Sequence, residues 1–266
     1  MSAPPPILEV RKLTNFFGKV CTAFDIDLAF RPGELTSVIG PNGAGKSTFI
    51  NLCTGHLPVQ SGRVIFRGRD VTHEPVHRRV RMGLGRSFQI VNVFPELTAR
   101  ENVMLPLLAR GGRAGRALSS LAGEARVRRD AEEQLERVGL GEQLGRKASA
   151  LSHGDKHLLE VAVALAARPA LLFLDEPTAG MNPVERTKLL ESIRKLARDG
   201  DTTFVLVEHD MDVVFSLSQR VVVLHFGEVL CDGPPEAVRA DARVREVYLG
   251  EDVVELMPEA AGVAPP

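Results

Sequence analysis

A glycine-rich segment near the amino terminus constrains this chain more than any other feature. The segment fits the pattern G-x-x-x-x-G-K-[ST], which is the phosphate loop of nucleotide hydrolases and kinases. Its residues are Gly40, Pro41, Asn42, Gly43, Ala44, Gly45, Lys46, Ser47 and Thr48. The glycines let successive backbone N–H groups point into one concavity that binds anions. Lys46 adds a positive charge for the outer phosphates, and Ser47 offers a hydroxyl to Mg²⁺.

The residues on both sides of this loop have the patterns that a phosphate loop requires. Residues 35–39 are typical of a buried strand, and residues 47–54 are typical of a helix. Gly55 suits the end of that helix, and the positive start of the helix favours phosphate. A glycine-rich turn with an incidental lysine does not account for strand, loop and helix together. We therefore predict nucleotide binding at residues 40–48.

The composition is typical of a globular protein and carries no sign of nucleic-acid binding. The 266 residues are 44% hydrophobic and 25% charged, and the net charge is -1, so no basic surface for nucleic acid is expected. The three cysteines are scattered and have no metal or disulfide spacing. Residues 1–6 lack a secretory signal, and the longest apolar run, residues 161–167, is too short to span a bilayer. We expect a soluble, cytoplasmic protein that serves a membrane only through a partner.

Short antiparallel strands are predicted in the first third of the chain, on either side of the phosphate-loop unit. Residues 7–13, 24–30 and 62–68 alternate in the manner of strands or lie between turn residues. The alternating apolar residues of the second segment are Phe24, Ile26, Leu28 and Phe30. We expect all four side chains on the buried face of that strand.

The middle of the chain changes character. Residues 97–150 are arginine-rich and free of strand signals, which predicts a helical subdomain inserted into an α/β core. Its basic cluster comprises Arg110, Arg113, Arg116, Arg126, Arg128 and Arg129. We interpret these arginines as solvated helix faces, with contact to membrane headgroups or a permease loop as the alternative. Beyond this region buried strands alternate with helices, which favours a mainly parallel sheet with both faces covered.

Two carboxylates and a histidine end buried strands, where ligands bind in parallel sheets. Asp175 follows the apolar residues 171–174, a pattern typical of the aspartate that holds Mg²⁺ beside a phosphate loop. Glu176 can orient and polarise a water molecule at the terminal phosphate. A polar turn is the alternative, but two carboxylates at the mouth of a buried strand call for a cation. His209 ends the next strand, so its imidazole could contact the same phosphate.

Two later helices begin with identifiable caps. Ser152 and Asp155 form an S-x-x-D pair that makes Ser152 the N-cap of a helix. Asn182 is predicted to cap a second helix, with Pro183 in its first position and Glu185 completing the capping box.

Taken together, these segments resemble the ATP-binding cassette proteins in order and spacing. The resemblance rests on the phosphate loop, Gln89, Leu151-Ser152-His153-Gly154-Asp155, Asp175-Glu176 and His209. It covers about residues 7–250, which we expect to form the ATPase domain, with the helical subdomain at about 97–150. Residues 251–266 are acidic, then proline-rich, and are expected to be a flexible tail. The resemblance implies an ATP-binding core, an N-terminal antiparallel β subdomain and a helical subdomain.

The resemblance also implies roles for individual residues toward ATP and Mg²⁺. Phe17 resembles the aromatic residue that stacks on adenine, and Gln89 resembles the glutamine that touches Mg²⁺ and senses the permease. Glu176 resembles the catalytic base, assisted by Lys46, and His209 resembles the switch histidine. The implied metal ligands are Ser47, Gln89 and Asp175.

A head-to-tail dimer with two ATP molecules at its interface is implied as well. The signature residues of one subunit would meet the γ-phosphate bound by the other, and they are Ser152, His153, Gly154 and Asp155. The signature is usually Leu-Ser-Gly-Gly-Gln, so His153 and Asp155 depart from it. Asp155 adds negative charge near a phosphate. Residues 179–182, Ala-Gly-Met-Asn, stand where Ser-Ala-Leu-Asp is common.

These departures resemble the ATPases of branched-chain amino acid importers. The implied partners are permease subunits in the inner or plasma membrane, a second cassette ATPase of the same or a different kind and, indirectly, a substrate-binding protein. The implied location is the cytoplasmic face of the cell membrane. Urea and short-chain amide importers share much of the pattern. Lipid or lipopolysaccharide exporters and soluble cassette ATPases are further alternatives, although the soluble kind usually carries two cassettes or a long coiled-coil insertion.

Overall fold

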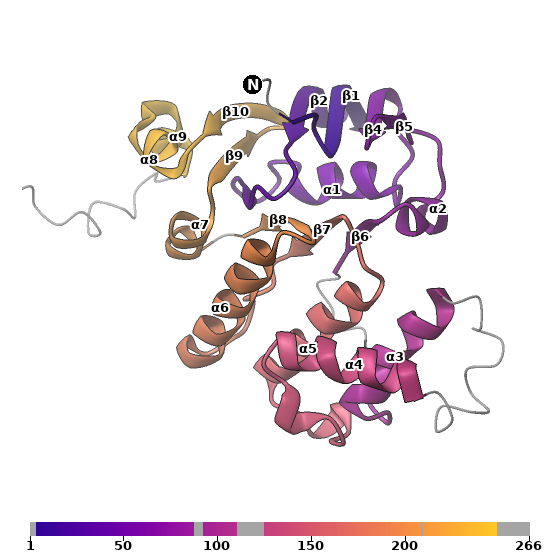
Figure 1. Cartoon of the computed structure of the whole chain (residues 1–266). Coiled ribbons are helices and arrows are strands. Elements are labelled where there is room, and N and C mark those ends of the chain that lie inside the picture. The colour runs from indigo at the N-terminus through magenta and orange to yellow at the C-terminus, as the bar shows by residue number, and fades with distance from the viewer. Residues whose placement is uncertain (1–3, 88–92, 111–124, 209, 249–266) are drawn as a thin grey trace, which may run out of the picture.

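The structure is a computed structural model that describes residues 4–87, 93–110, 125–208 and 210–248. Its strands form two sheets, and its helices lie between and around these sheets (Figure 1). The strands are β1 (Leu8–Phe17), β2 (Val20–Phe30), β3 (Thr36–Ile39), β4 (Ser61–Phe66), β5 (Arg69–Asp70), β6 (Leu84–Arg86), β7 (Leu171–Asp175), β8 (Thr203–Val207), β9 (Arg220–His225) and β10 (Glu228–Gly233). The α-helices are α1 (Lys46–Thr54), α2 (Val76–Arg81), α3 (Ala99–Arg110), α4 (Ala125–Arg137), α5 (His153–Ala166), α6 (Pro183–Asp199), α7 (Met211–Leu217), α8 (Pro235–Ala240) and α9 (Ala242–Tyr248). Short 3₁₀ helices follow α4 at η3 (Gly141–Gln143) and precede α5 at η4 (Ala148–Ala150).

The larger sheet has six strands in the order β10-β9-β3-β8-β7-β6. The pairs β9–β3, β3–β8, β8–β7 and β7–β6 are parallel, and only β10 runs antiparallel to its neighbour. Every residue of β3, β7 and β8 is buried, as expected for parallel strands that are covered on both faces. The prediction of a mainly parallel core sheet is therefore confirmed. The carboxyl ends of β3, β7 and β8 lie at one edge, because Val207 is paired with both Val38 and Asp175.

The smaller sheet has the antiparallel order β2-β1-β4-β5, as predicted for the first third of the chain. One expectation in it is wrong: the side chain of Phe24 is 49% exposed. Leu13 pairs with Ile26 but Asn15 pairs with Ala23, so β2 contains one extra residue at this point. The bulge lies at Asp25, whose φ is 46°, and it reverses the faces of the residues before it. Ala23 therefore faces the core in place of Phe24.

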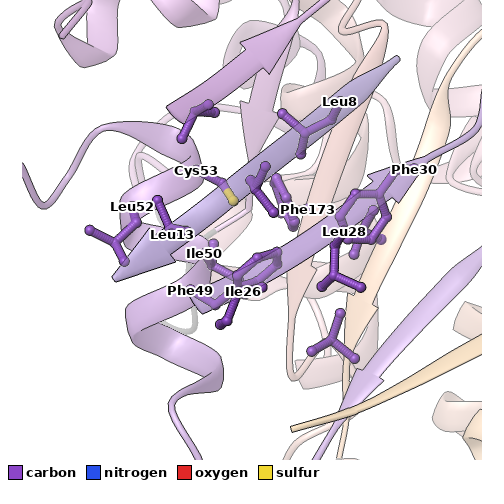
Figure 2. Packing of buried hydrophobic residues seen from close by; sticks show 14 of the residues in the cluster. Leu8, Leu13, Ile26, Leu28, Phe30, Phe49, Ile50, Leu52, Cys53 and Phe173 are labelled. Carbon is purple, nitrogen blue, oxygen red and sulfur yellow. The ribbon is translucent and has the colours of Figure 1, made fainter. Parts of the chain in front are cut away.

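Helix α1 lies between the two sheets and forms the centre of one hydrophobic core (Figure 2). Phe49 of α1 lies 6.1 Å from Phe30 of β2, measured between ring centroids, and Phe30 lies 6.4 Å from Phe173 of β7. These aromatic contacts connect the small sheet, the phosphate-loop helix and the large sheet. The helix that carries Lys46 is thus fixed from both sides by packing.

A buried arginine of α2 contacts the carboxyl-terminal end of α1. Arg79 is 2% exposed, and its guanidinium donates hydrogen bonds to the carbonyl oxygens of Leu52, Cys53, Thr72 and Glu74 at 2.6–2.9 Å. Two of these carbonyls belong to the last turn of α1, where helix carbonyls have no partner within the helix. Arg79 therefore stabilises the end of the helix opposite the phosphate loop.

Helices α3, α4 and α5 lie on the side of the large sheet away from α1 (Figure 1). Their apolar faces share a second core with β7, β8 and α6, through buried residues such as Val103, Leu135 and Leu159. The inserted helical subdomain expected in the middle of the chain is thus observed. Of its basic cluster, Arg128 pairs with Glu132, and Arg113 and Arg116 lie outside the described residues. Among the described helices, none is both long and apolar enough to cross a membrane.

Candidate active site

The phosphate loop can be built only with glycine at two of its positions. Gly40 has φ 155°, and a Cβ there would lie 2.2 Å from the carbonyl oxygen of Leu224 in β9. Gly45 has φ 100°, and a Cβ there would lie 2.3 Å from the carbonyl oxygen of Thr22 in β2. The loop is therefore pressed between strands of both sheets. Its backbone is held further by the N–H of Gly227, which donates to the carbonyl oxygen of Ala44 at 3.0 Å.

Lys46 is the buried cation of the loop. Its ammonium donates hydrogen bonds to the carbonyl oxygens of Gly40 at 2.7 Å and Pro41 at 3.1 Å, so it curls over the loop that precedes it. Burial lowers the pKa of Lys46, and the carboxylates of Glu176 and Asp175 act against that effect. Those two carboxylates are the ones expected at the mouth of β7. Lys46 follows β3 and Asp175 ends β7, so the ammonium and the two carboxylates lie at the same edge of the sheet, where ligands bind in parallel sheets.

Asp175 ends β7 in a buried position, 5% exposed. Its Oδ2 accepts a hydrogen bond of 2.6 Å from Nη2 of Arg86, the last residue of β6. Nη1 of the same guanidinium contacts Oδ1 of Asn51 in α1. One arginine therefore ties the carboxylate to the helix of the phosphate loop.

Glu176 follows Asp175 with a strained backbone. Its φ is 48°, in the left-handed region that few residues other than glycine adopt, and strain of this kind gathers at functional sites. The backbone N–H of Glu176 donates to the carbonyl oxygen of Val207 at 2.8 Å, which fixes the turn against the end of β8.

The next turn is fastened to the loop after β8. The N–H and the hydroxyl of Thr178 donate to Oε1 of Glu208, at 3.1 and 2.8 Å. Thr178 and Glu208 are both buried. This link places the loop that carries Glu176 beside the segment that leads to residue 209.

The signature segment forms the start of α5. Ser152 is the N-cap, because its Oγ accepts the N–H of Asp155 at 3.1 Å, as predicted. The N–H of Gly154 donates to Oε1 of Glu185 in α6 at 3.1 Å. The ring of His153 is exposed and has Nε2 3.4 Å from the carbonyl oxygen of Ala179. The two segments in which the sequence departs from the usual family pattern therefore touch each other.

Some of the other predicted site residues lie within the described part of the chain, and some lie outside it. Phe17 ends β1 with its side chain 50% exposed, as an aromatic platform for a base requires. Ser47 is exposed in the first turn of α1, and Asn182 caps α6 through the N–H groups of Val184 and Glu185. Gln89 and His209 lie outside the described residues, as does the tail of residues 251–266.

Four contacting residues were missed by sequence reasoning: Arg86, Thr178, Glu208 and the carboxylate of Glu185 as a partner of Gly154. Each lies within four residues of a predicted motif: Arg86 ends β6, Thr178 lies in the turn after β7, Glu208 follows β8, and Glu185 lies in the first turn of α6. A polar residue next to a motif at the carboxyl edge of the sheet was therefore the available signal.

Comparison with protein families agrees with this geometry. The family model described as "ABC transporter" matches residues 23–179, more than half of the chain. The chain belongs to the ATP-binding cassette transporter family. A second model, described as "Branched-chain amino acid ATP-binding cassette transporter", matches residues 228–254 of this cassette.

Curated relatives span almost the whole cassette. The High-affinity branched-chain amino acid transport ATP-binding protein LivG of Escherichia coli (strain K12) is 38% identical over 251 residues, covering 92% of this chain and 98% of the relative. The Probable branched-chain amino acid transport ATP-binding protein LivG of Archaeoglobus fulgidus is 35% identical over 252 residues, covering 94% and 98%. The cassette is thus an ATPase of the transporter kind.

Solved structures share the fold. The ADP conformation of MJ1267, an ATP-binding cassette of an ABC transporter, superposes with a TM-score of 0.83 at 30% identity and covers 93% of this chain and 100% of its own. The dimeric structure of a post-hydrolysis state of the cassette MJ0796, bound to ADP and Pi, has a TM-score of 0.72 at 27% identity and covers 86% and 98%.

Proposed function

We propose that this cassette is the ATP-hydrolysing subunit of an importer of branched-chain amino acids. The observation that carries the proposal is the single edge at which Lys46, Asp175 and Glu176 gather, in a chain whose relatives named for this transport match it almost end to end. We take residues 7–250 as the ATPase domain, with its helical subdomain at about 97–150. The partners would be two permease subunits, a second cassette ATPase and a substrate-binding protein, with the cassette peripheral on the cytoplasmic face of the membrane.

The site is suited to a nucleoside triphosphate with Mg²⁺. Phe17 would stack on the adenine, and the loop of residues 40–48 would surround the phosphates. The donor set fits the metal, because Mg²⁺ takes oxygen ligands and is usually bound by one or two carboxylates with phosphates. Ser47, Asp175 and Gln89 would hold it. When bound, Mg²⁺ would neutralise the charge that develops on the phosphates during hydrolysis.

Hydrolysis would use Glu176 and Lys46. A water oxygen forms a bond to the γ-phosphorus, the bond from that phosphorus to the bridging oxygen breaks, and the products are ADP and phosphate. Glu176 accepts a proton from the attacking water, while Lys46 stabilises charge on the outer phosphate oxygens. His209 would contact the γ-phosphate from the end of β8. The left-handed backbone of Glu176, fixed to Val207, would hold its carboxylate at the mouth of the sheet.

The second half of each site would come from another subunit. In a head-to-tail dimer Ser152, His153, Gly154 and Asp155 at the start of α5 would face the γ-phosphate held by the partner. The positive end of a helix suits that anion. Closing on ATP and reopening after hydrolysis would drive the permease.

The test is the variant Glu176→Gln in the complex purified from membranes in mild detergent. We expect it to bind ATP and to lose at least about 100-fold of the hydrolysis rate, because a positioned base contributes about 10²–10⁴-fold. Glu191→Gln, an exposed carboxylate on α6, is the control and should keep the wild-type rate. Wild-type hydrolysis by Glu176→Gln would contradict the assignment of the base.

The proteins that co-purify with the cassette distinguish branched-chain amino acid import from the alternative functions. Permeases with a second cassette ATPase should be recovered, and the binding protein encoded with them should bind leucine, isoleucine or valine. Binding of urea or short-chain amides alone would favour the related importers. Recovery with ribosomes or nucleic acid would mean that the ATPase has a different task.

A further inference from the structure

Glu185 makes a contact that the roles proposed above do not use. It lies in the first turn of α6, and its Oε1 accepts the N–H of Gly154 at 3.1 Å. A Cβ on Gly154 would lie 2.7 Å from both Cβ and Cγ of Glu185. The glycine is therefore what lets this carboxylate approach the start of α5.

The N–H of Gly154 is one of a few groups at this helix start that can bind an anion. The first four N–H groups of a helix have no partner within it. In α5 the hydroxyl of Ser152 accepts the N–H of Asp155, and Glu185 accepts that of Gly154. The hydrogen bond from Gly154 is the main cause that lowers the pKa of Glu185, and the hydroxyl of Ser152 adds to it. The group is thus a carboxylate at neutral pH.

The backbone around Glu185 is anchored, so its side chain is the part that can move. Asn182 caps α6 by accepting the N–H groups of Val184 and Glu185, each at 3.0 Å. The next residue, Arg186, pairs with Asp210 at the start of α7. Cap and ion pair together hold the first turn of α6 in place.

We propose that Glu185 is a displaceable carboxylate that occupies the N–H of Gly154 until the γ-phosphate of ATP on the partner subunit replaces it. The inference rests on the proposed function, because a phosphate reaches Gly154 only in the head-to-tail dimer. A carboxylate and a phosphate cannot share one N–H, and like charges repel each other. Glu185 therefore opposes closure of the dimer and raises the ATP concentration that closure requires.

The test compares Glu185→Gln with the matched control Glu191→Gln, both in a Glu176→Gln background and in the full complex with permeases and second ATPase. Glutamine keeps the size and the acceptor oxygen but removes the charge. ATP retained after rapid gel filtration is measured against ATP concentration. We expect the half-maximal concentration to fall about threefold for Glu185→Gln, from the strength of a charge at a helix start, and to stay unchanged for Glu191→Gln.

An unchanged or higher half-maximal concentration for Glu185→Gln, or an equal fall for Glu191→Gln, would overturn the inference. Failure of the Glu176→Gln complex to retain ATP at all would overturn the proposed function and the inference with it.

A second measurement examines the resting contact in the isolated, nucleotide-free chain. Hydrogen exchange at the amide of Gly154 should be faster in Glu185→Ala, while the later turns of α5 keep wild-type protection. Unchanged protection of Gly154 would overturn the inference, whatever happens to ATP retention.

Discussion

Nη2 of Arg86 donates a 2.6 Å hydrogen bond to Oδ2 of Asp175, and the two side chains are 12% and 5% exposed. The same guanidinium contacts Asn51 of α1, so β6, β7 and the helix of the phosphate loop meet at this one arginine. Burying an ion pair is costly in hydration, and removing one partner leaves the other charge uncompensated. Arg86 thus holds the negative charge that we propose as a ligand of Mg²⁺.

Replacing Arg86→Met should destabilise the fold by about 3–5 kcal/mol, the usual cost of breaking a buried pair. Urea unfolding would measure the loss. Saturating Mg²⁺ and ATP should restore part of the lost stability, because a bound cation would again compensate Asp175. Arg137→Met is the control, since Arg137 pairs with the more exposed Asp199 and Asp201 and should cost at most about 1 kcal/mol. Equal losses of stability in the two variants would show that the buried pair of Arg86 and Asp175 contributes no more than an exposed ion pair.

Thr178→Val should weaken the link between the loop of Glu176 and the loop after β8. The hydroxyl of Thr178 donates to Glu208 at 2.8 Å in a buried position, and losing such a bond costs about 1–3 kcal/mol. We expect stability and the rate of ATP hydrolysis to fall together, because the link fixes the turn of the proposed base. Thr187→Val, on the exposed face of α6, should change stability by at most about 0.5 kcal/mol. Wild-type kcat and stability in Thr178→Val would contradict this role.

Phe17→Ala should raise the Kd for ATP about tenfold, because stacking of a base on an aromatic ring contributes about 1–3 kcal/mol. Calorimetric titration of the purified chain would measure it. The neighbouring Phe16, 41% exposed, is the matched control, since successive side chains of a strand point to opposite faces. If both variants bind ATP like the wild type, the adenine does not stack at this end of β1.

The buried His157 should make the free energy of unfolding depend on pH. It is buried in α5, and burial, followed by the nearby His153, lowers its pKa from the ordinary 6.5. Below that value the unfolded chain binds a proton that the folded chain does not, so the free energy of unfolding should fall as the pH drops from 7 to 5. His157→Gln should flatten this fall. A steeper slope in His157→Gln would mean that the folded protein binds the proton at His157 more readily than the unfolded chain does.

Local patterns allowed much of the fold to be predicted from the sequence. The phosphate loop between β3 and α1, and the caps at Ser152 and Asn182, depend on residues within a few positions of each other. The face of Phe24 was predicted wrongly, because one inserted residue at Asp25 reverses an alternation that otherwise continues through β2.

The contacts that complete the candidate site join residues that are far apart in the sequence. Arg86 and Asp175 are 89 positions apart, and Gly154 and Glu185 are 31 positions apart. No periodicity connects such residues, since strand order and helix placement alone bring them together. The sequence could therefore predict which residues lie at the carboxyl edge of the sheet, but not which of them touch.

Uptake of leucine into proteoliposomes containing this cassette, its permeases, the second ATPase and the binding protein tests the central claim most directly. We predict uptake that requires ATP on the side of the cassette and that is lost with Glu176→Gln while the complex stays assembled. ATP hydrolysis by the assembled complex without uptake of leucine, isoleucine or valine would contradict the proposed function.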